Sequence, residues 1–316
     1  MDEATVISEQ APIAVRKTRR PLTAFFLRLV REKPLGTFGA VSVLLLFIVG
    51  ISADLIAPHG FNEIYVAPPL TAPSPEVLLG SDNLGRDLLS RIIYGARVSM
   101  VVGLSSMTIS VAISCFIGII CGFLGGKMDM FVQRFVDAWM CFPGLFIVLS
   151  IMSLLGPGMM QLIITIGVMY GIGGSRIVRS AVMGIKNNIY VEASRSIGCS
   201  TARTLLLHIL PNVAAPIIIM FTTGMGGVIL AEATLSFLGF GIPPPTPSWG
   251  GMLNQGRPFM INGPWLAIWP GVALTIVVYG INMFGDALRD LLDPRLRGGL
   301  GRYTFRKAKT EKKTSA

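Results

Sequence analysis

Long apolar runs separated by short polar segments set the pattern of this chain. Six runs are apolar enough to cross the roughly 30 Å hydrocarbon core of a membrane, which takes about 20 helical residues. They lie near residues 35–57, 98–124, 138–155, 159–177, 212–238 and 264–284. The pattern therefore predicts an all-α integral membrane protein with six transmembrane helices.

The distribution of basic residues indicates how these spans are oriented in the membrane. Of the 27 Lys and Arg residues, 23 lie in the two tails and in the polar segments after the second and fourth runs. The other four are Arg86, Arg91, Arg97 and Arg257. Because cytoplasmic loops carry the excess of Lys and Arg, both termini are expected inside the cell.

The apolar runs and the distribution of basic residues together divide the chain into regions. We expect a cytoplasmic N-terminal tail at 1–34, a first transmembrane helix at 35–57 and an extracytoplasmic segment at 58–96. A main transmembrane unit follows at 97–286, with a cytoplasmic loop at 186–211, and a cytoplasmic C-terminal tail covers 287–316. The Lys-rich stretch 302–316 is expected to be disordered and to contact anionic membrane lipid. The long polar tail before the first run indicates an uncleaved span rather than a signal peptide.

Composition narrows the class of protein. Apolar residues make up 52% and charged residues 14% of the 316-residue chain, whereas soluble domains carry about 25% charged residues. The net charge of +10 is spread over tails and alternate loops, so nucleic acid is not an expected partner. The four cysteines lack metal-ligand spacing and are interpreted as apolar packing residues.

Residues 186–211 are unusual because they are polar and helix-forming between two apolar runs. We expect a first short helix near 190–197, a turn at Gly198 and a second helix capped by Ser200. Pro211 fits the first turn of the fifth span. Such a helix pair would project a rigid knob suited to transmitting the movement of a partner. The alternative is a helix pair lying on the membrane, with residues 205–207 facing lipid.

The loop also resembles the EAA loop of ABC importer permeases. Glu192, Ala193, Gly198 and the dipeptide Leu210-Pro211 match that pattern in type and spacing. Ser194 replaces the second alanine, and His208 matches the dipeptide, oligopeptide and nickel branch of the family. Three further segments resemble the same branch, at 79–99, 231–250 and 285–297.

This resemblance implies a type I ABC importer permease subunit that moves di- or oligopeptides, or a related small solute, across the cytoplasmic membrane of a prokaryote. It implies a heterodimer with a homologous permease, two ABC ATPases and an extracytoplasmic solute-binding protein. ATP and Mg²⁺ would be bound by the ATPases, and no cofactor is expected in this chain. The implied ATPase-coupling residues are Tyr190, Glu192, Ala193, Ser194, Gly198, Cys199, His208 and Pro211.

Other functions have less support in the sequence. A nucleotide-binding phosphate loop is absent because Met128 follows Gly126-Lys127 and position 121 is cysteine. The only two histidines, His59 and His208, fall on opposite sides of the membrane and in no catalytic or metal motif, so an enzyme is not expected. A secondary transporter or channel working without ATPases is the main alternative, although no internal repeat is visible. A membrane scaffold is the third.

Glu232 is an ionisable residue near the outer end of the fifth span. Such groups are expensive in a membrane and usually face protein or a water-filled cavity. Glu232 is therefore a candidate pathway or gate residue. The alternative, which the sequence favours, is an anchor for neighbouring backbone or for a partner subunit.

Overall fold

A computed structural model describes the backbone of residues 21–292 and the side chains from residue 27 onward. The outer parts of both predicted tails, including 302–316, lie outside the described residues. The described chain is helical apart from its turns and connecting segments. Its α-helices are α1 (Pro21–Glu32), α2 (Pro34–Ile51), α3 (Ala53–Ile56), α4 (Leu88–Leu124), α5 (Gly126–Met140), α6 (Gly144–Leu155), α7 (Met159–Ile185), α8 (Ile189–Ser196), α9 (Thr201–Thr204), α10 (Ala214–Phe237), α11 (Trp249–Gly256) and α12 (Trp265–Leu292).

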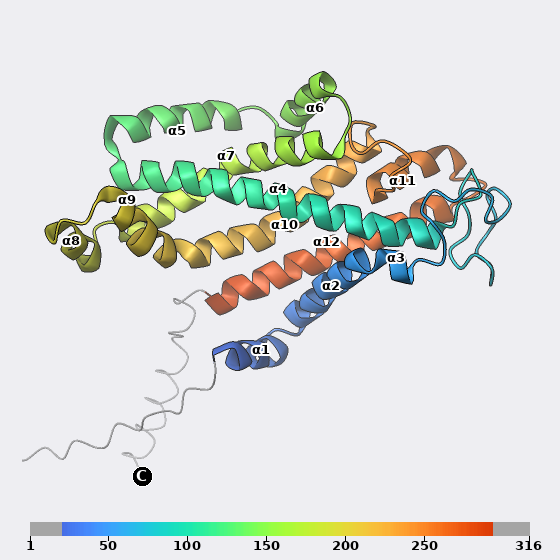
Figure 1. Ribbon diagram of the computed structural model, residues 1–316, viewed down its shortest axis with the longest axis horizontal. Coiled ribbons are helices and arrows are strands. Elements are labelled where there is room, and N and C mark those ends of the chain that lie inside the picture. Colours follow the sequence, from blue (N-terminus) through green and yellow to red (C-terminus); the bar gives the residue numbers. More distant parts are fainter. Residues whose placement is uncertain (1–20, 293–316) are drawn as a thin grey trace, which may run out of the picture.

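Five helical stretches in the described chain are long and apolar enough to cross a membrane. They are α2, α4, α7, the stretch Thr201–Phe237 and α12. A sixth span is formed when the bent pair of α5 and α6 is counted as one. In Figure 1, α8 and α9 lie at one end of the long helices, and α11 and the segment that precedes α4 lie at the other.

The third predicted span, 138–155, is not one helix. The axes of α5 and α6 differ by 85°, with the break at Cys141–Pro143. Proline has no backbone N–H and its ring clashes with the preceding helical turn, while the residue before it disfavours the α conformation. The apolar composition is continuous across this break, which is why the pattern of apolar positions alone predicted an unbroken helix.

The second span starts ten residues before its predicted position at 98. Helix α4 begins at Leu88, where the Asp87 carboxylate accepts a hydrogen bond of 2.9 Å from the Ser90 N–H. Part of the predicted extracytoplasmic segment 58–96 is therefore the first turns of a 37-residue helix. The first span also differs, because α2 ends at Ile51 and the short α3 follows it.

The fifth span is longer than predicted at its cytoplasmic end. A π-helical turn, Leu205–Ile209, and a 3-10 turn, Leu210–Val213, join α9 to α10 without a break. Pro211 lies in the first residues of the 3-10 turn, where its missing N–H removes no necessary hydrogen bond. The second short helix of the predicted knob is thus the start of the fifth span.

Glycines bring α4 and α7 into close contact. A Cβ atom on Gly118 would lie 2.6 Å from the Ser175 carbonyl oxygen of α7, and one on Gly171 would lie 2.8 Å from Ile113 Cβ of α4. Gly122 and Gly167 face the opposite helix in the same way. Small residues at four-residue spacing permit this approach of two backbones. Helices α4 and α7 therefore form a closely packed pair in the frame.

A buried polar network fixes the outer end of the molecule. The Arg86 Nε donates to Asp82 at 2.6 Å, and both side chains are nearly inaccessible to solvent. Arg86 and Arg91 both donate to the Gln255 side chain of α11, at 3.4 and 3.3 Å. Arg91 also donates to the Phe61 carbonyl at 3.1 Å. These bonds join the segment before α4, α4 itself and α11 into one outer layer.

Candidate functional site

The polar loop after α7 forms a short helix followed by a sharp turn. Helix α8 ends at Ser196, and Gly198 adopts a φ of +80°, in the left-handed region that glycine enters at low cost. The Ser200 hydroxyl then accepts a hydrogen bond of 3.4 Å from the Arg203 N–H and caps α9. The sequence expectations for the Gly198 turn and the Ser200 cap are confirmed.

One face of α8 is anchored in the protein. Val191 is fully buried, and the Ser194 side chain is 4% exposed. The Ser194 and Thr204 hydroxyls lie 3.1 Å apart and link α8 to α9 in a buried hydrogen bond. Ser194, at the position of the family's second alanine, therefore adds a polar contact that alanine could not make.

The loop also rests on the end of α4. The Arg195 guanidinium lies 4.5 Å from the centre of the Phe123 ring, within the range of a cation–π interaction. Val191 belongs to the same apolar cluster as Phe123 of α4 and Val182 of α7. Helix α8 therefore contacts the cytoplasmic ends of both α4 and α7.

The opposite face of α8 is open. Ile189 is 85% exposed and Ile197 is 80% exposed, while Tyr190 is partly exposed. Glu192 and Ala193 also lie on the exposed surface. Exposed apolar side chains beside a carboxylate on a firmly anchored helix are typical of a protein contact surface. We call the exposed residues of 189–197 the α8 surface.

The predicted coupling residues fall into two groups. Tyr190, Glu192, Ala193, Ser194 and Gly198 belong to α8 or its turn, with Cys199 half-buried just beyond. His208 is half-buried and Pro211 is exposed, and both lie in the helical stretch leading into α10. The Asn212 side chain donates to the His208 carbonyl at 2.7 Å within that stretch. These two residues thus belong to the base of the loop rather than to the α8 surface.

Glu232 is fully buried in α10. Its Oε1 accepts a hydrogen bond of 2.7 Å from the Ser236 hydroxyl, and its Oε2 has no hydrogen-bond partner among the described residues. The side chain lines neither the 490 Å³ cavity between α4, α7 and α10 nor the 630 Å³ cavity at the cytoplasmic ends of α10 and α12. The one hydrogen bond lies within α10 itself, so the anchoring and pathway roles of Glu232 both stay predictions.

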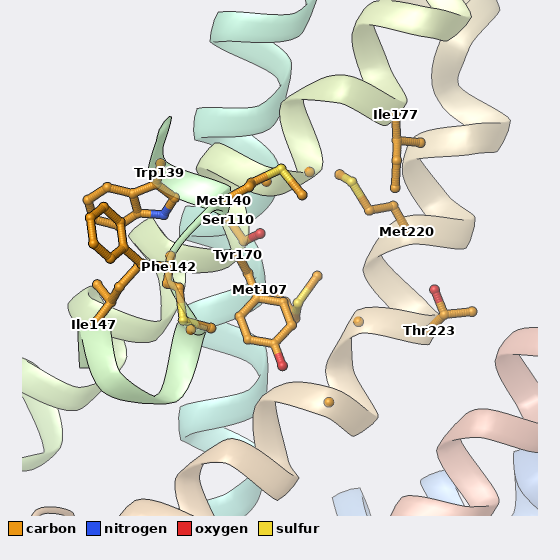
Figure 2. Close-up of a pocket in the computed structure, with 16 residues that line it drawn as sticks. Met107, Ser110, Trp139, Met140, Phe142, Ile147, Tyr170, Ile177, Met220 and Thr223 are labelled. Atoms are coloured by element: carbon orange, nitrogen blue, oxygen red, sulfur yellow. The ribbon is translucent and has the colours of Figure 1, made fainter. Parts of the chain in front are cut away.

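A cavity of 490 Å³ lies between α4, α7, α10 and the α5–α6 bend (Figure 2). Figure 2 shows Trp139 and Phe142 from the bend on one side and Met220 and Thr223 of α10 on the other. Its wall contains no charged side chain and is formed by Met107, Ser110, Trp139, Met140, Phe142, Gly144, Ile147, Met169, Tyr170, Gly173, Gly174, Ile177, Met220, Thr223, Gly224 and Gly227. Flexible methionines and bare glycine backbone suit a surface that accommodates different shapes.

Sequence reasoning did not find this cavity. Its residues come from three separate helices and from a bend that the apolar pattern concealed. The concentration of methionine and glycine in these runs was the only available signal. Across the described residues, no group of three or more His, Cys, Asp and Glu side chains could hold a metal ion.

A multi-span helical frame, a cavity open between its helices and an anchored cytoplasmic helix define a membrane transport component. The chain belongs to the family described as binding-protein-dependent transport system inner membrane component, whose model matches residues 114–298. It is a multi-pass protein of the cytoplasmic membrane and a permease subunit of an ABC importer. Membership of this family supports the ATP-driven importer over the secondary transporter or channel, and it implies ATPase and membrane-complex partners.

Several relatives match over most of the chain. A dipeptide transport system permease protein of Alkalihalophilus pseudofirmus is 35% identical over 85% of this chain and 88% of its own. A di/tripeptide permease protein of Pseudomonas aeruginosa is 37% identical over 88% and 93%. A glutathione permease protein of Escherichia coli is 36% identical over 86% and 90%.

A solved structure has the same fold. It is an inward-facing form of the MetNI methionine ABC transporter, with a TM-score of 0.50 and 16% sequence identity. The match covers 64% of this chain and 96% of the other. The likeness confirms the type I importer permease fold that the sequence predicted.

Proposed function

We propose that this chain imports short peptides, or a closely related small solute, as one half of a heterodimer with a homologous permease. Two ABC ATPases dock on the cytoplasmic side, one of them on the α8 surface, and an extracytoplasmic binding protein delivers the solute. The names of the relatives, which include dipeptide, di/tripeptide and glutathione permeases, support this substrate class.

One observation carries the coupling assignment. Helix α8 is fixed to the frame by buried Val191 and by the Ser194–Thr204 hydrogen bond, yet its outer face is exposed. A rigid helix held in a groove of a moving partner transmits rigid-body displacement. Closure of the ATPases would push α8 and, through it, the ends of α4 and α7. Because those helices line the cavity, its access would alternate between the two sides.

The chain itself carries out no covalent chemistry in this proposal. ATP and Mg²⁺ bind in the ATPases, and this subunit requires no cofactor. The uncharged cavity of Figure 2 forms this subunit's part of the solute path. An apolar wall with few hydrogen-bonding groups holds a passing solute weakly, as transport requires.

The test is to alter the α8 surface in the assembled transporter. Gly198→Val forces a β-branched residue into the left-handed region, and Glu192→Lys reverses a charge on the exposed face. Both variants are expected to lower co-purification of the ATPases and ATP-driven uptake of a labelled dipeptide by at least about tenfold, equivalent to about 1.4 kcal/mol of docking free energy.

Matched controls separate coupling from general strain. Gly156 has a φ of +81° and, like Gly198, has open space where a Cβ would lie, with no atom within 4 Å, but it follows α6 at the outer side. Gly156→Val should therefore reproduce the backbone strain without loss of ATPase binding. Normal assembly and uptake in both α8 variants would contradict the coupling assignment.

A further inference from the structure

A second cavity opens at the cytoplasmic ends of α10 and α12. Its volume is 630 Å³, and it shares Ile177, Met220 and Thr223 with the cavity of Figure 2. These three side chains lie together on one side of the first cavity in Figure 2, so the two cavities adjoin there. A solute leaving the first cavity toward the cytoplasm would enter the second.

The second cavity differs from the first in bearing charge. Asp286 and Arg289, both from α12, line it, whereas the rest of its wall is apolar apart from the Thr223 hydroxyl. Residues three positions apart lie on the same helix face, with Cβ atoms about 5–6 Å from each other. The cavity thus presents one carboxylate and one guanidinium side by side.

Neither charge is neutralised by another residue that the structure describes. Asp286 and Arg289 are exposed, and neither has an ion-pair or hydrogen-bond partner among residues 21–292. Asp290, by contrast, pairs with Lys33 at 2.5 Å on the side of α12 that faces α2. Charged groups at the end of a membrane path usually face a water-filled cavity and mark the route of a solute.

We propose that Asp286 and Arg289 bind the two charged ends of a short zwitterionic peptide at the cytoplasmic exit of the path. The proposal rests on the function proposed above. Asp286 would accept hydrogen bonds from the peptide ammonium group, and Arg289 would donate two parallel hydrogen bonds to its carboxylate. An extended dipeptide is at most about 7 Å long from end to end. This length is similar to the separation of two side-chain charges on neighbouring turns of one helix.

The division between the two cavities has a physical reason. A charged end would find no partner in the uncharged first cavity, so it would remain there only briefly. At the exit, water reaches both side chains, and hydrogen bonds from partly solvated charges are weak enough for rapid release. The two charges would thus draw the peptide out of the membrane and then release it into the cytoplasm.

The experiment measures binding of radiolabelled dialanine to the purified transport complex without ATP or binding protein. Competition by N-acetyl-dialanine and by dialanine amide reports how strongly each free end is recognised. In Asp286→Asn the preference for a free amine should fall by about threefold to tenfold, and in Arg289→Gln the preference for a free carboxylate should fall similarly. Each variant should keep its preference at the other end.

Asp290→Asn is the matched control, because it removes a carboxylate from the next position of α12 but on the face that binds Lys33. It should leave both preferences at their wild-type values. Unchanged end preferences in the Asp286 and Arg289 variants, or no dialanine binding in a complex that imports dialanine, would overturn the exit site while leaving the proposed function intact. A wild-type complex that does not import dialanine, glutathione or other short peptides would instead overturn the proposed substrate class.

Discussion

The α4–α7 pair and helix α5 are neighbours that are held in place by different forces. Glycines let α4 and α7 meet backbone to backbone, so their contact leaves no room for even a methyl group at Gly118 or Gly171. Helix α5 has one buried side chain, Val136, and exposes several large apolar residues, among them Phe131 at 78%. Figure 1 shows α5 and α6 at the edge of the bundle, beside α7.

Ion pairs replace close packing at α5. Asp129 of α5 accepts two hydrogen bonds of 2.6 Å from Arg179 of α7, and Asp137 pairs with Arg176. The comparison indicates a rigid α4–α7 frame, which carries the α8 surface, and a helix α5 whose link to α7 is mainly ionic. Helix α6, the other half of the bend, instead packs its buried Val148 and Met152 into the apolar core. Ion pairs can break and re-form at lower cost than a packed interface.

The largest expected effect comes from breaking the frame. Gly118→Ala places a Cβ 2.6 Å from the Ser175 carbonyl oxygen and 2.7 Å from Val178 Cβ, so the two helices must separate. We expect a loss of roughly 2–3 kcal/mol, as for other overpacked interiors. Gly184→Ala in α7 is the control, because no atom lies within 4 Å of its Cβ and the helix gains propensity. Apparent melting temperatures of the purified complex should fall for Gly118→Ala only, and equal values would contradict the close-packed frame.

Much of the frame could be predicted from the sequence alone. Apolar runs of about 20 residues specify membrane helices because backbone polar groups must be satisfied within the segment. The Gly198 turn and the Ser200 cap were also predictable, because each depends on local backbone chemistry. The bend at Pro143 and the start of α4 at Leu88 were missed, since hydropathy averages over a window and does not register a proline or an Asp cap.

The parts that were not predictable depend on tertiary placement. The Ser194–Thr204 hydrogen bond and the contact of Arg195 with Phe123 join residues whose proximity no local pattern encodes. The cavity likewise exists only where three helices and the bend converge. Glu232 is the opposite case. The sequence singled it out as a rare ionisable residue in a span, but only the structure shows that it is fully buried in packed protein.

A smaller effect is expected from loosening α5, which forms part of the cavity wall. Asp129→Asn weakens the ion pair with Arg179. The Asp129 side chain is 14% exposed and the Arg179 side chain is 28% exposed. We expect a loss of about 1 kcal/mol, at the upper end of the range for surface pairs because the geometry is bidentate. A spin label on Cys141, which is exposed at the bend, should become more mobile in this variant when the other three cysteines are replaced.

Exchanging the two charges provides the control for this measurement. The double variant Asp129→Arg with Arg179→Asp restores opposite charges across the same pair of helices and should recover part of the lost order. A label whose mobility is equal in the wild type and in Asp129→Asn would show that the wall is held by contacts other than this ion pair.

The smallest expected effect lies at the outer edge of the frame, where another ion pair joins α3 to α4. The Arg97 guanidinium donates to Asp54 at 2.8 Å and, with the Tyr94 hydroxyl, holds the pKa of that carboxyl below its ordinary value. A lowered pKa in the folded state adds stability above the ordinary pKa of about 4, and this stability is lost as the pH falls through the folded value. The difference in melting temperature between wild type and Asp54→Asn should therefore be constant from about pH 5 to 8 and shrink toward zero below about pH 4.

Asp54 is 67% exposed, so solvent screens the pair and the difference should stay below that of Asp129→Asn. An equal difference would show that these two ion pairs contribute alike, and that helix α5 is not distinguished by its dependence on them.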